Sequence, residues 1–217
     1  MKKIMFNDRY GLNQAVLVGR KTKTRRIINA PENATGCELL VVQKQHREYV
    51  SEKRVLIIHT SDHVGVKIDI PYQVGDEVAV AQSYRDVSHE VFLFATKVRG
   101  KEYRAGWGNK MFVRADLMPH RIKITNVRVE RLQDISDEDC MKEGIIKMYD
   151  GCDHRYVYGC ITGNKKVKIT PSAKVEVGYL TPQEAFAYLI DKVSGKGTWE
   201  SNPYVFVYDF ELIKQQL

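Results

Sequence analysis

The sequence predicts an α+β fold rich in strands, and two observations lead to this prediction. Short strand patterns far outnumber helical patterns along the 217 residues, and the helical patterns lie between strands, where the chain turns. A small β-barrel or a strongly curved mixed sheet, with helices closing its ends, fits both observations. A doubly wound parallel sheet would require a more regular alternation of strands and helices.

The N-terminal third of the chain predicts a helix, a strand and a meander. Residues 9–19 carry apolar side chains at helical spacing, and Gly19 stands where such a helix would end. A strand is expected at Ile27 and Ile28. Residues 38–72 hold three β-rich runs separated by polar residues, which predict a small β-meander inserted into the fold.

The centre of the chain predicts three strands and an irregular loop. The turn at 75–76 leads into a short buried strand at 77–80, and another strand is expected at 92–98. Residues 99–111 are rich in glycine and aromatic residues and are expected to form the loop. Apolar and polar residues alternate clearly over 122–132, which predicts a long strand with one buried face.

The C-terminal third predicts two helices and a final strand. Ser136 is placed to cap a helix with an acidic first turn, which ends at Gly144. Residues 146–179 are polar with weak strand signals and are interpreted as a second insertion. Residues 181–184 form a capping box with proline at the first helical position. Residues 204–210 predict an aromatic-rich strand.

Length and composition indicate a single domain over residues 1–217, with insertions at about 36–73 and about 146–180. The hydrophobic content of 43% and the charged content of 28% argue against wholesale disorder. No apolar run is long enough to span a bilayer, and the N-terminus lacks the apolar region of a signal peptide. The four cysteines at irregular spacings suggest free thiols. A soluble cytoplasmic protein without a membrane partner is expected, and the sequence does not indicate its oligomeric state.

The most informative segment is 19–26, which holds five cations and two hydroxyls in eight residues. The first thirty residues carry eight Lys or Arg and one acid, so their charge of +7 equals the formal net charge of the chain. A positive field concentrated in one segment favours a phosphate-bearing ligand. The candidate binding residues of this segment are Arg20, Lys23, Arg25 and Arg26. The alternative is a strand edge that its cations protect from aggregation.

Four separated segments of the sequence resemble the ASCH domain, which belongs to the PUA-like superfamily of small β-barrels associated with RNA. In chain order they are Gly-Arg-Lys-Thr-x-Thr-x-Arg, Gly-Asp-Glu-Val-Ala-Val, the run from Ile124 to Ile145 and the run from Gly195 to Glu211. The resemblance covers roughly half of the chain and is closest to a long ASCH form found in phages and prophages of bacteria. It implies a PUA-like β-barrel with helices closing its ends, and RNA or a nucleoside-type small molecule as the partner.

The resemblance also implies candidate chemistry. One small bacterial branch of the family resembles an amidohydrolase that removes the acetyl group from 4-acetylcytidine with a Lys, a Thr and a Glu. The matching positions here are Lys21, Thr24 and Glu143. Another branch is linked to RNA cleavage, and many members are assigned only as RNA binders. An amidohydrolase, a non-catalytic RNA-binding module and a ribonuclease therefore remain open.

The residue types of this candidate triad suit amide hydrolysis. The hydroxyl of Thr24 becomes a nucleophile only when a neighbour accepts its proton, and Lys21 can do so only when neutral. Clustered cations lower the pKa of a lysine, whereas an ion pair with Glu143 would raise it and oppose the base role. The spacing of three residues between Lys21 and Thr24 requires a bend before both reach one cleft. If the site exists, Lys21 and Glu143 lie within about 4 Å, but a purely structural salt bridge would have the same geometry.

Five other residues are candidate ligand contacts. Glu77 follows a turn and is placed either at the mouth of the barrel or on the surface. Tyr84 and Trp107 are aromatic residues of the kind that stack on bases. Asn109 and Lys110 lie in the glycine-rich loop, where they can reach a ligand.

No metal and no cofactor are expected. Cys152, His154 and Cys160 are the residues that most resemble a metal site. They lack a paired fourth ligand at the spacing that zinc requires. The proposed chemistry therefore depends on side chains alone.

Overall fold

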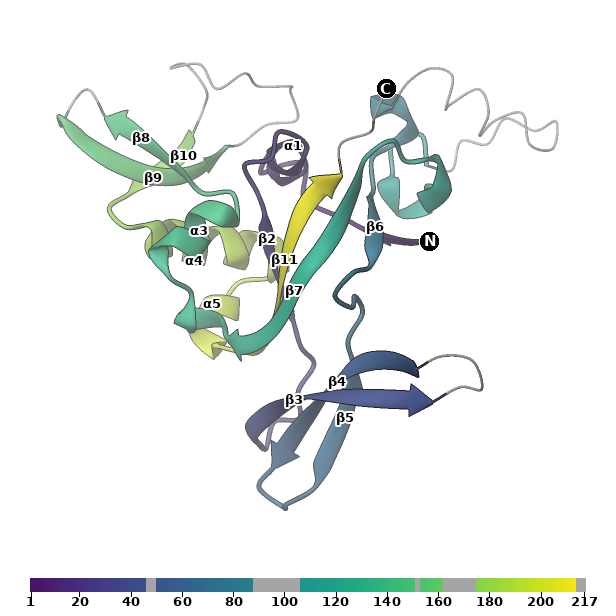
Figure 1. Cartoon of the computed structure of the whole chain (residues 1–217). Helices are drawn as coiled ribbons and strands as arrows, with labels where there is room; N and C mark the ends of the chain where they lie inside the picture. Colours follow the sequence, from purple (N-terminus) through teal and green to yellow (C-terminus); the bar gives the residue numbers. More distant parts are fainter. Residues whose placement is uncertain (46–49, 88–105, 151–152, 162–174, 214–217) are drawn as a thin grey trace.

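A computed structural model describes residues 1–45, 50–87, 106–150, 153–161 and 175–213. These residues form a central mixed sheet, two smaller antiparallel sheets and several short helices (Figure 1). The predicted α+β class, rich in strands, is confirmed. Among the described residues, no helix is long and apolar enough to cross a membrane.

The central sheet has five strands in the order β1-β6-β7-β11-β2. Their bounds are Lys2–Ile4 for β1, Lys23–Ile27 for β2, Glu77–Val80 for β6, Arg121–Arg131 for β7 and Tyr204–Ile213 for β11. Only β1 and β6 pair in parallel, so the sheet is mixed. The alternation in β7 buries Ile122, Ile124 and Val127, as predicted.

The described strands do not close into a barrel, because β1 and β2 lie at opposite edges of the sheet and do not pair. The two edges are linked through a side chain instead. Arg26 Nη2, on β2, donates to the carbonyl oxygen of Met5, the residue that follows β1, at 2.7 Å. A strongly curved mixed sheet therefore describes the fold, and closure into a PUA-like barrel stays a prediction.

Each segment interpreted as an insertion contains a three-stranded antiparallel sheet. The first sheet is formed by β3 (Ala34–Gln45), β4 (Val50–Thr60) and β5 (Gly65–Asp69), which confirms the predicted meander. The second has the order β10-β9-β8, with bounds Ile146–Asp150 for β8, Arg155–Ile161 for β9 and Val175–Tyr179 for β10. In Figure 1 the first sheet lies below the central sheet, and the second lies at the upper left, above the labels of α3, α4 and α5.

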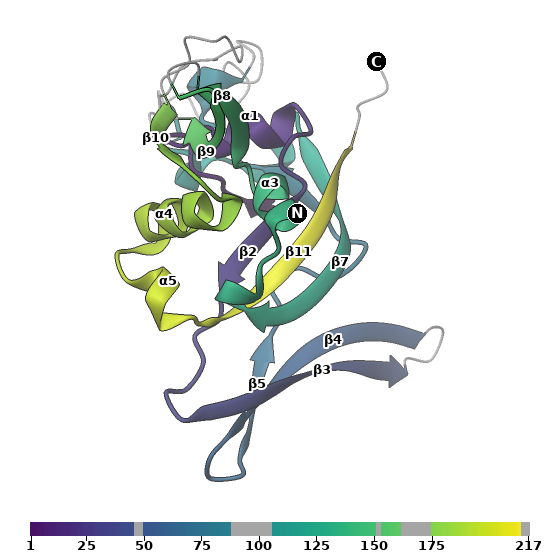
Figure 2. The same cartoon turned by 90° about the vertical axis from the view of Figure 1, so that its left-hand side faces the viewer.

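The helices lie along one side of the central sheet, near β2 and β11 (Figure 2). Their bounds are Leu12–Leu17 for α1, Asp137–Lys142 for α3, Pro182–Ser194 for α4 and Thr198–Ser201 for α5. Short 3₁₀ turns occur at Tyr84–Asp86 (η1), Lys110–Phe112 (η2), Ala115–Leu117 (η3) and Leu132–Asp134 (η4). The predicted caps of α3 and α4 are present: the hydroxyls of Ser136 and Thr181 accept from backbone N–H groups at 3.2 Å.

Two boundaries differ from the sequence prediction. Helix α1 begins at Leu12 and not at residue 9, because Gly11 adopts the left-handed region with φ 63°. The strand expected at Ile27 and Ile28 is β2, which runs from Lys23 to Ile27 because pairing with β11 extends it back into the basic segment. The strand predicted at 92–98 lies outside the described residues.

Candidate functional site

Lys21 and Glu143 meet in the interior of the molecule. Lys21 is 1% exposed and precedes β2, and Glu143 follows α3. The Nζ of Lys21 donates to Oε2 of Glu143 at 2.5 Å and to its backbone oxygen at 2.8 Å. The residue after Glu143 is Gly144, which has φ +113°. A Cβ at this position would lie 3.0 Å from the Leu12 side chain, so glycine allows the chain to pack closely beside the ion pair. The predicted approach of Lys21 and Glu143 is confirmed.

Burial controls the charge of Lys21. Loss of hydration lowers the pKa of the Lys21 ammonium, while attraction and hydrogen bonding to Glu143 oppose the change. Arg26 and Arg25 add smaller contributions that also lower the pKa. The sequence argument gave this direction but assigned it to neighbouring cations, whereas burial is the main cause.

The three candidate catalytic residues line one cavity of about 440 Å³. Because the regular strand begins at Lys23, Lys21 lies before it, and both Lys21 and Thr24 reach the cavity. Thr24 is 4% exposed, and no hydrogen bond is found for its hydroxyl within the described part of the chain. This hydroxyl is available to a molecule in the cavity. Much of the remaining wall is apolar and is formed by Met5, Phe6, Leu12, Phe186, Leu189 and Ile190.

An ion-pair network of four cations and four carboxylates adjoins the cavity, and Lys21, Arg25 and Glu143 belong to both. Its members are Lys21, Lys23, Arg25, Arg128, Glu130, Asp139, Glu143 and Asp209. The nitrogens of Arg25 contact Glu130 at 2.5 Å, Asp139 at 3.0 Å and Glu143 at 3.1 Å. The charges of the network balance within the protein, so Lys23 and Arg25 already have anionic partners.

Asp139 lies at the centre of this network. It contacts Lys23 at 2.8 Å, Arg25 at 3.0 Å and Arg128 at 2.5 Å. Burial alone would favour the protonated acid, but hydrogen bonds and attraction from Lys23 and Arg25 lower the pKa of Asp139 to about 2. The carboxylate is therefore ionised at neutral pH and holds the cations in place.

The remaining cations of the basic segment also have partners inside the protein. Arg20 Nη1 donates to the carbonyl oxygen of Gly144 at 2.8 Å. The guanidinium of Arg26 lies 5.7 Å from the centre of the Phe6 ring and borders the cavity. The Nε of Arg26 is buried without a hydrogen-bond partner, so a ligand in the cavity could satisfy it.

Of the candidates in the glycine-rich loop, Lys110 joins the cavity and Asn109 does not. Lys110 Nζ pairs with Asp8 at 2.8 Å and donates to the carbonyl oxygen of Phe6. The side chain of Asn109 accepts from the backbone N–H of Met111 at 3.0 Å and caps η2.

Three other candidates lie away from the cavity. Glu77 is exposed on β6 and lies 3.9 Å from Arg121. Tyr84 is 5% exposed, and its hydroxyl accepts from the backbone N–H of Arg114, so its ring is not open to a base. Trp107 is 43% exposed but does not line the cavity.

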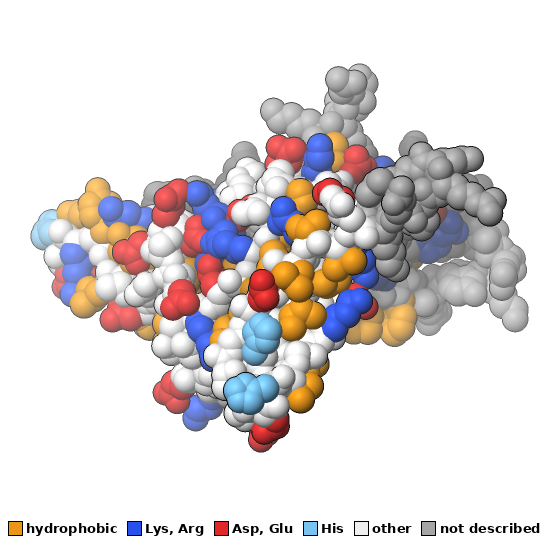
Figure 3. Space-filling view, turned by 60° about the horizontal axis from the view of Figure 1, so that its bottom comes forward, with side chains coloured by type: hydrophobic (Ala, Val, Ile, Leu, Met, Phe, Trp, Pro, Cys, Tyr) orange, Lys and Arg blue, Asp and Glu red, His pale blue; other side chains and the backbone are white. Residues whose placement is uncertain are grey.

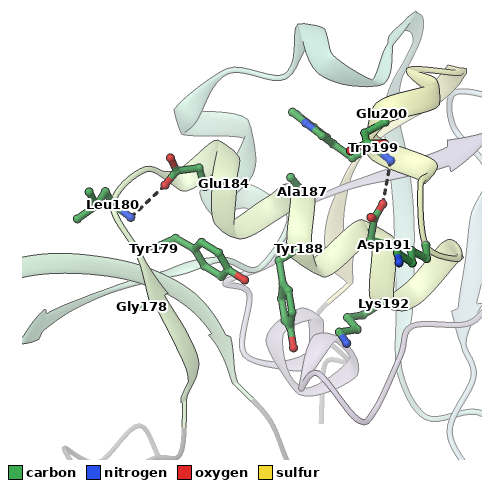
Figure 4. A pocket seen from close by; sticks show the side chains of 11 residues that line it. Gly178, Tyr179, Leu180, Glu184, Ala187, Tyr188, Asp191, Lys192, Trp199 and Glu200 are labelled. Atoms are coloured by element: carbon green, nitrogen blue, oxygen red, sulfur yellow. Dashed lines mark hydrogen bonds between the residues drawn. The ribbon is translucent and has the colours of Figure 1, made fainter.

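A second concavity, of about 810 Å³, lies between α4, α5 and β10 (Figure 4). The rings of Tyr179 and Tyr188 are 5.6 Å apart in it. Two of its acids are occupied in helix caps: Asp191 accepts from the N–H of Trp199 at 2.9 Å, and Glu184 belongs to the capping box of α4. Because these two acids serve caps, this concavity is a weaker candidate than the cavity of Lys21.

Sequence reasoning missed the acids that surround the basic segment. Asp139 was interpreted only as an acid that complements the helix dipole, and Glu130 as an outward strand residue. The signal that could have indicated these acids was the positive charge of residues 19–26. Cations that become buried require carboxylates as partners. No cluster of three or more metal-ligating side chains is found among the described residues, and Cys152 lies outside them.

Comparison with known proteins does not assign the chain to a family. No family model, no curated protein and no solved structure matches the chain. The resemblance to the ASCH domain therefore depends on the four sequence segments alone. The function has to be argued from the geometry of the cavity.

Proposed function

We propose that this chain is an amidohydrolase of the ASCH type that deacylates a small modified nucleoside, with an acylated cytidine as the first substrate to test. The observation that carries the proposal is the convergence of Lys21, Thr24 and Glu143 on one cavity. Its volume of about 440 Å³ falls in the range of small-molecule sites. A PUA-like barrel is part of the same proposal.

Thr24 is the proposed nucleophile. Its hydroxyl oxygen attacks the acyl carbon while its proton passes to neutral Lys21, whose neutral form burial favours. Glu143, 2.5 Å from Lys21 Nζ, accepts the proton that the ammonium must first lose. The carbon–nitrogen bond then breaks, and the leaving amine takes the proton from Lys21. Water hydrolyses the resulting threonine ester, which releases the carboxylic acid and restores the hydroxyl.

The ion-pair network favours a small ligand over a long RNA strand. Lys23 and Arg25, which the sequence assigned to phosphates, already contact carboxylates. A phosphate would have to displace these buried acids from their partners, at a considerable electrostatic cost. An uncharged acylated base, by contrast, would meet the apolar wall and the unpaired Nε of Arg26.

The proposal is tested by incubating the protein with a panel of acylated and unmodified nucleosides and identifying the products by mass spectrometry. Thr24→Val keeps the size and β-branching of the residue, so turnover should fall by orders of magnitude while binding stays near normal. Thr22→Val is the matched control, because Thr22 lies outside the residues that line the cavity, and it should keep full turnover. Lys21→Met should lose turnover through loss of the base.

A wild-type protein that turns over no acylated nucleoside but binds RNA would contradict the hydrolase. The non-catalytic RNA-binding module would then be the better description. Cleavage of RNA that Thr24→Val abolishes would indicate the ribonuclease alternative.

A further inference from the structure

The outer edge of the β3–β5 sheet is a long strand without a pairing partner among the described residues. The order β3-β4-β5 places β3 at one edge and β5 at the other. Strand β3 has 12 residues, whereas β5 has five, of which the charged Lys67 and Asp69 are exposed. Proteins commonly protect a strand edge by making it short or by placing charges on it, and β5 has both features.

Strand β3 has neither form of protection over its central residues. Leu40, Val41 and Val42 are exposed by 37%, 56% and 38%, and no charge interrupts residues 39–43. Because Leu40 and Val42 point to one face and Val41 to the other, the edge is apolar on both faces. Figure 3 views the molecule from this end and shows hydrophobic side chains grouped among charged ones. A long apolar edge of this kind is a template for pairing with another strand.

We propose that β3 pairs with β3 of a second copy of this chain, antiparallel, around a two-fold axis at Val41. In this register Leu40 lies opposite Val42 of the second copy, and Glu38 lies opposite position 44, a lysine. The two-fold axis repeats each pair, so the interface contains two opposite-charge pairs and a central apolar group. Self-complementarity of this kind is what a symmetric dimer requires.

The register with the two-fold axis at Leu40 fits less well. With the axis at Leu40, Glu38 lies opposite Val42, and the lysine at position 44 lies opposite Gly36, so both charges lose their partners. The apolar residues would still meet, so the charges select the register. We choose a second copy of the chain as the partner because the acid at one end of β3 complements the base at its other end. An unrelated partner strand would not require such complementarity within β3.

Sedimentation velocity at protein concentrations from about 1 µM to about 1 mM tests the proposal. We expect a reversible monomer–dimer equilibrium. Val41→Lys places two lysines at the two-fold axis and should abolish the dimer. Val64→Lys is the matched control, because Val64 is also 56% exposed but lies in the turn between β4 and β5, and it should leave the dimer intact.

Charge reversal tests the register. Glu38→Lys and Lys44→Glu should each raise the dimer dissociation constant by about tenfold, because each replaces two attractive pairs with two repulsive ones. A mixture of the two variants should form a heterodimer at near wild-type affinity, since opposite charges then face each other again. A wild-type protein that is monomeric throughout overturns the proposal. A dimer insensitive to Val41→Lys, or open-ended assembly in place of a dimer, would do so as well.

Discussion

The two faces of strand β2 differ in whether their charged and polar side chains are paired. Successive side chains point to opposite faces of a strand, so Lys23 and Arg25 face α3 whereas Thr24 and Arg26 face the other way. On the first face all cationic groups meet carboxylates, including Asp139. On the second, the Thr24 hydroxyl and the Nε of Arg26 have no hydrogen bond within the described part of the chain. The comparison teaches that ion pairs fix one face of the strand, even though Arg25 also reaches the cavity wall, while the other face brings the unsatisfied Nε of Arg26 to that wall.

The largest expected effect comes from breaking the paired face. Arg25→Met removes the one cation that contacts Glu130, Asp139 and Glu143 together and leaves the network with an excess negative charge, which should lower the free energy of unfolding by about 3–5 kcal/mol. Chemical denaturation of both proteins measures this difference. The control is Arg114→Met, which removes an exposed ion pair with Asp116 and should change the free energy of unfolding far less. Similar small losses in both variants would show that the network does not stabilise the fold.

The second effect is a dependence of stability on acid. The pKa of Asp139 is about 2 in the folded protein, below the value of about 3.9 in an unfolded chain. The folded state therefore binds the proton more weakly, so this stabilisation is complete above about pH 4 and is lost as the pH falls towards 2. Asp139→Asn should flatten this part of the stability curve, by up to about 2 kcal/mol, when unfolding is measured from pH 5 to about pH 2. A slope unchanged by the substitution would assign the acid sensitivity to other groups.

The elements with local signals were predictable from the sequence. The caps at Ser136 and Thr181 and the alternation in 122–132 each lie within a few residues, and each produced the expected helix or strand. The extent of β2 was not predictable, because lysine and arginine do not favour strands and the pairing with β11 joins residues far apart in the chain.

The site was predictable only in part for the same reason. The ion pairs of Arg25 join it to residues 105 to 118 positions away, and no local pattern reports such contacts. The approach of Lys21 to Glu143 was expected because of the family resemblance and not because of spacing. The capping box at residues 181–184 predicted helix α4, but it did not indicate that Phe186 of this helix would line the cavity.

The third effect sharpens the comparison within one strand. Arg26→Met is the same substitution as Arg25→Met on the opposite face, and the methionine can still pack on Phe6. We expect a loss of about 1 kcal/mol in the free energy of unfolding, far less than for Arg25→Met. If Arg26 binds the substrate, the KM of the deacylation should rise up to about tenfold with kcat nearly unchanged. A loss of stability equal to that of Arg25→Met would show that the two faces are not distinct.

The smallest expected effect is the salt dependence of any RNA binding. From the sequence alone, Arg20, Lys23, Arg25 and Arg26 would each neutralise a phosphate. Four contacts to a single strand give a slope of about −2.8 in a plot of log affinity against log salt concentration. In the structure, Lys23 and Arg25 contact carboxylates and Arg20 contacts the Gly144 backbone.

Arg26 and Lys110 are then the two cavity cations left for a phosphate, and Lys110 already pairs with Asp8. Two contacts predict a slope of about −1.4, so the affinity should fall only about sevenfold between 50 and 200 mM salt. Fluorescence anisotropy with a labelled single-stranded RNA measures this slope. The ion pairs at Lys23 and Arg25 are internal and should persist over this range, because buried pairs are screened much less than exposed ones. A slope near −2.8 would mean that RNA displaces the carboxylates from the paired face, and the distinction between the two faces of β2 would then hold only for the free protein.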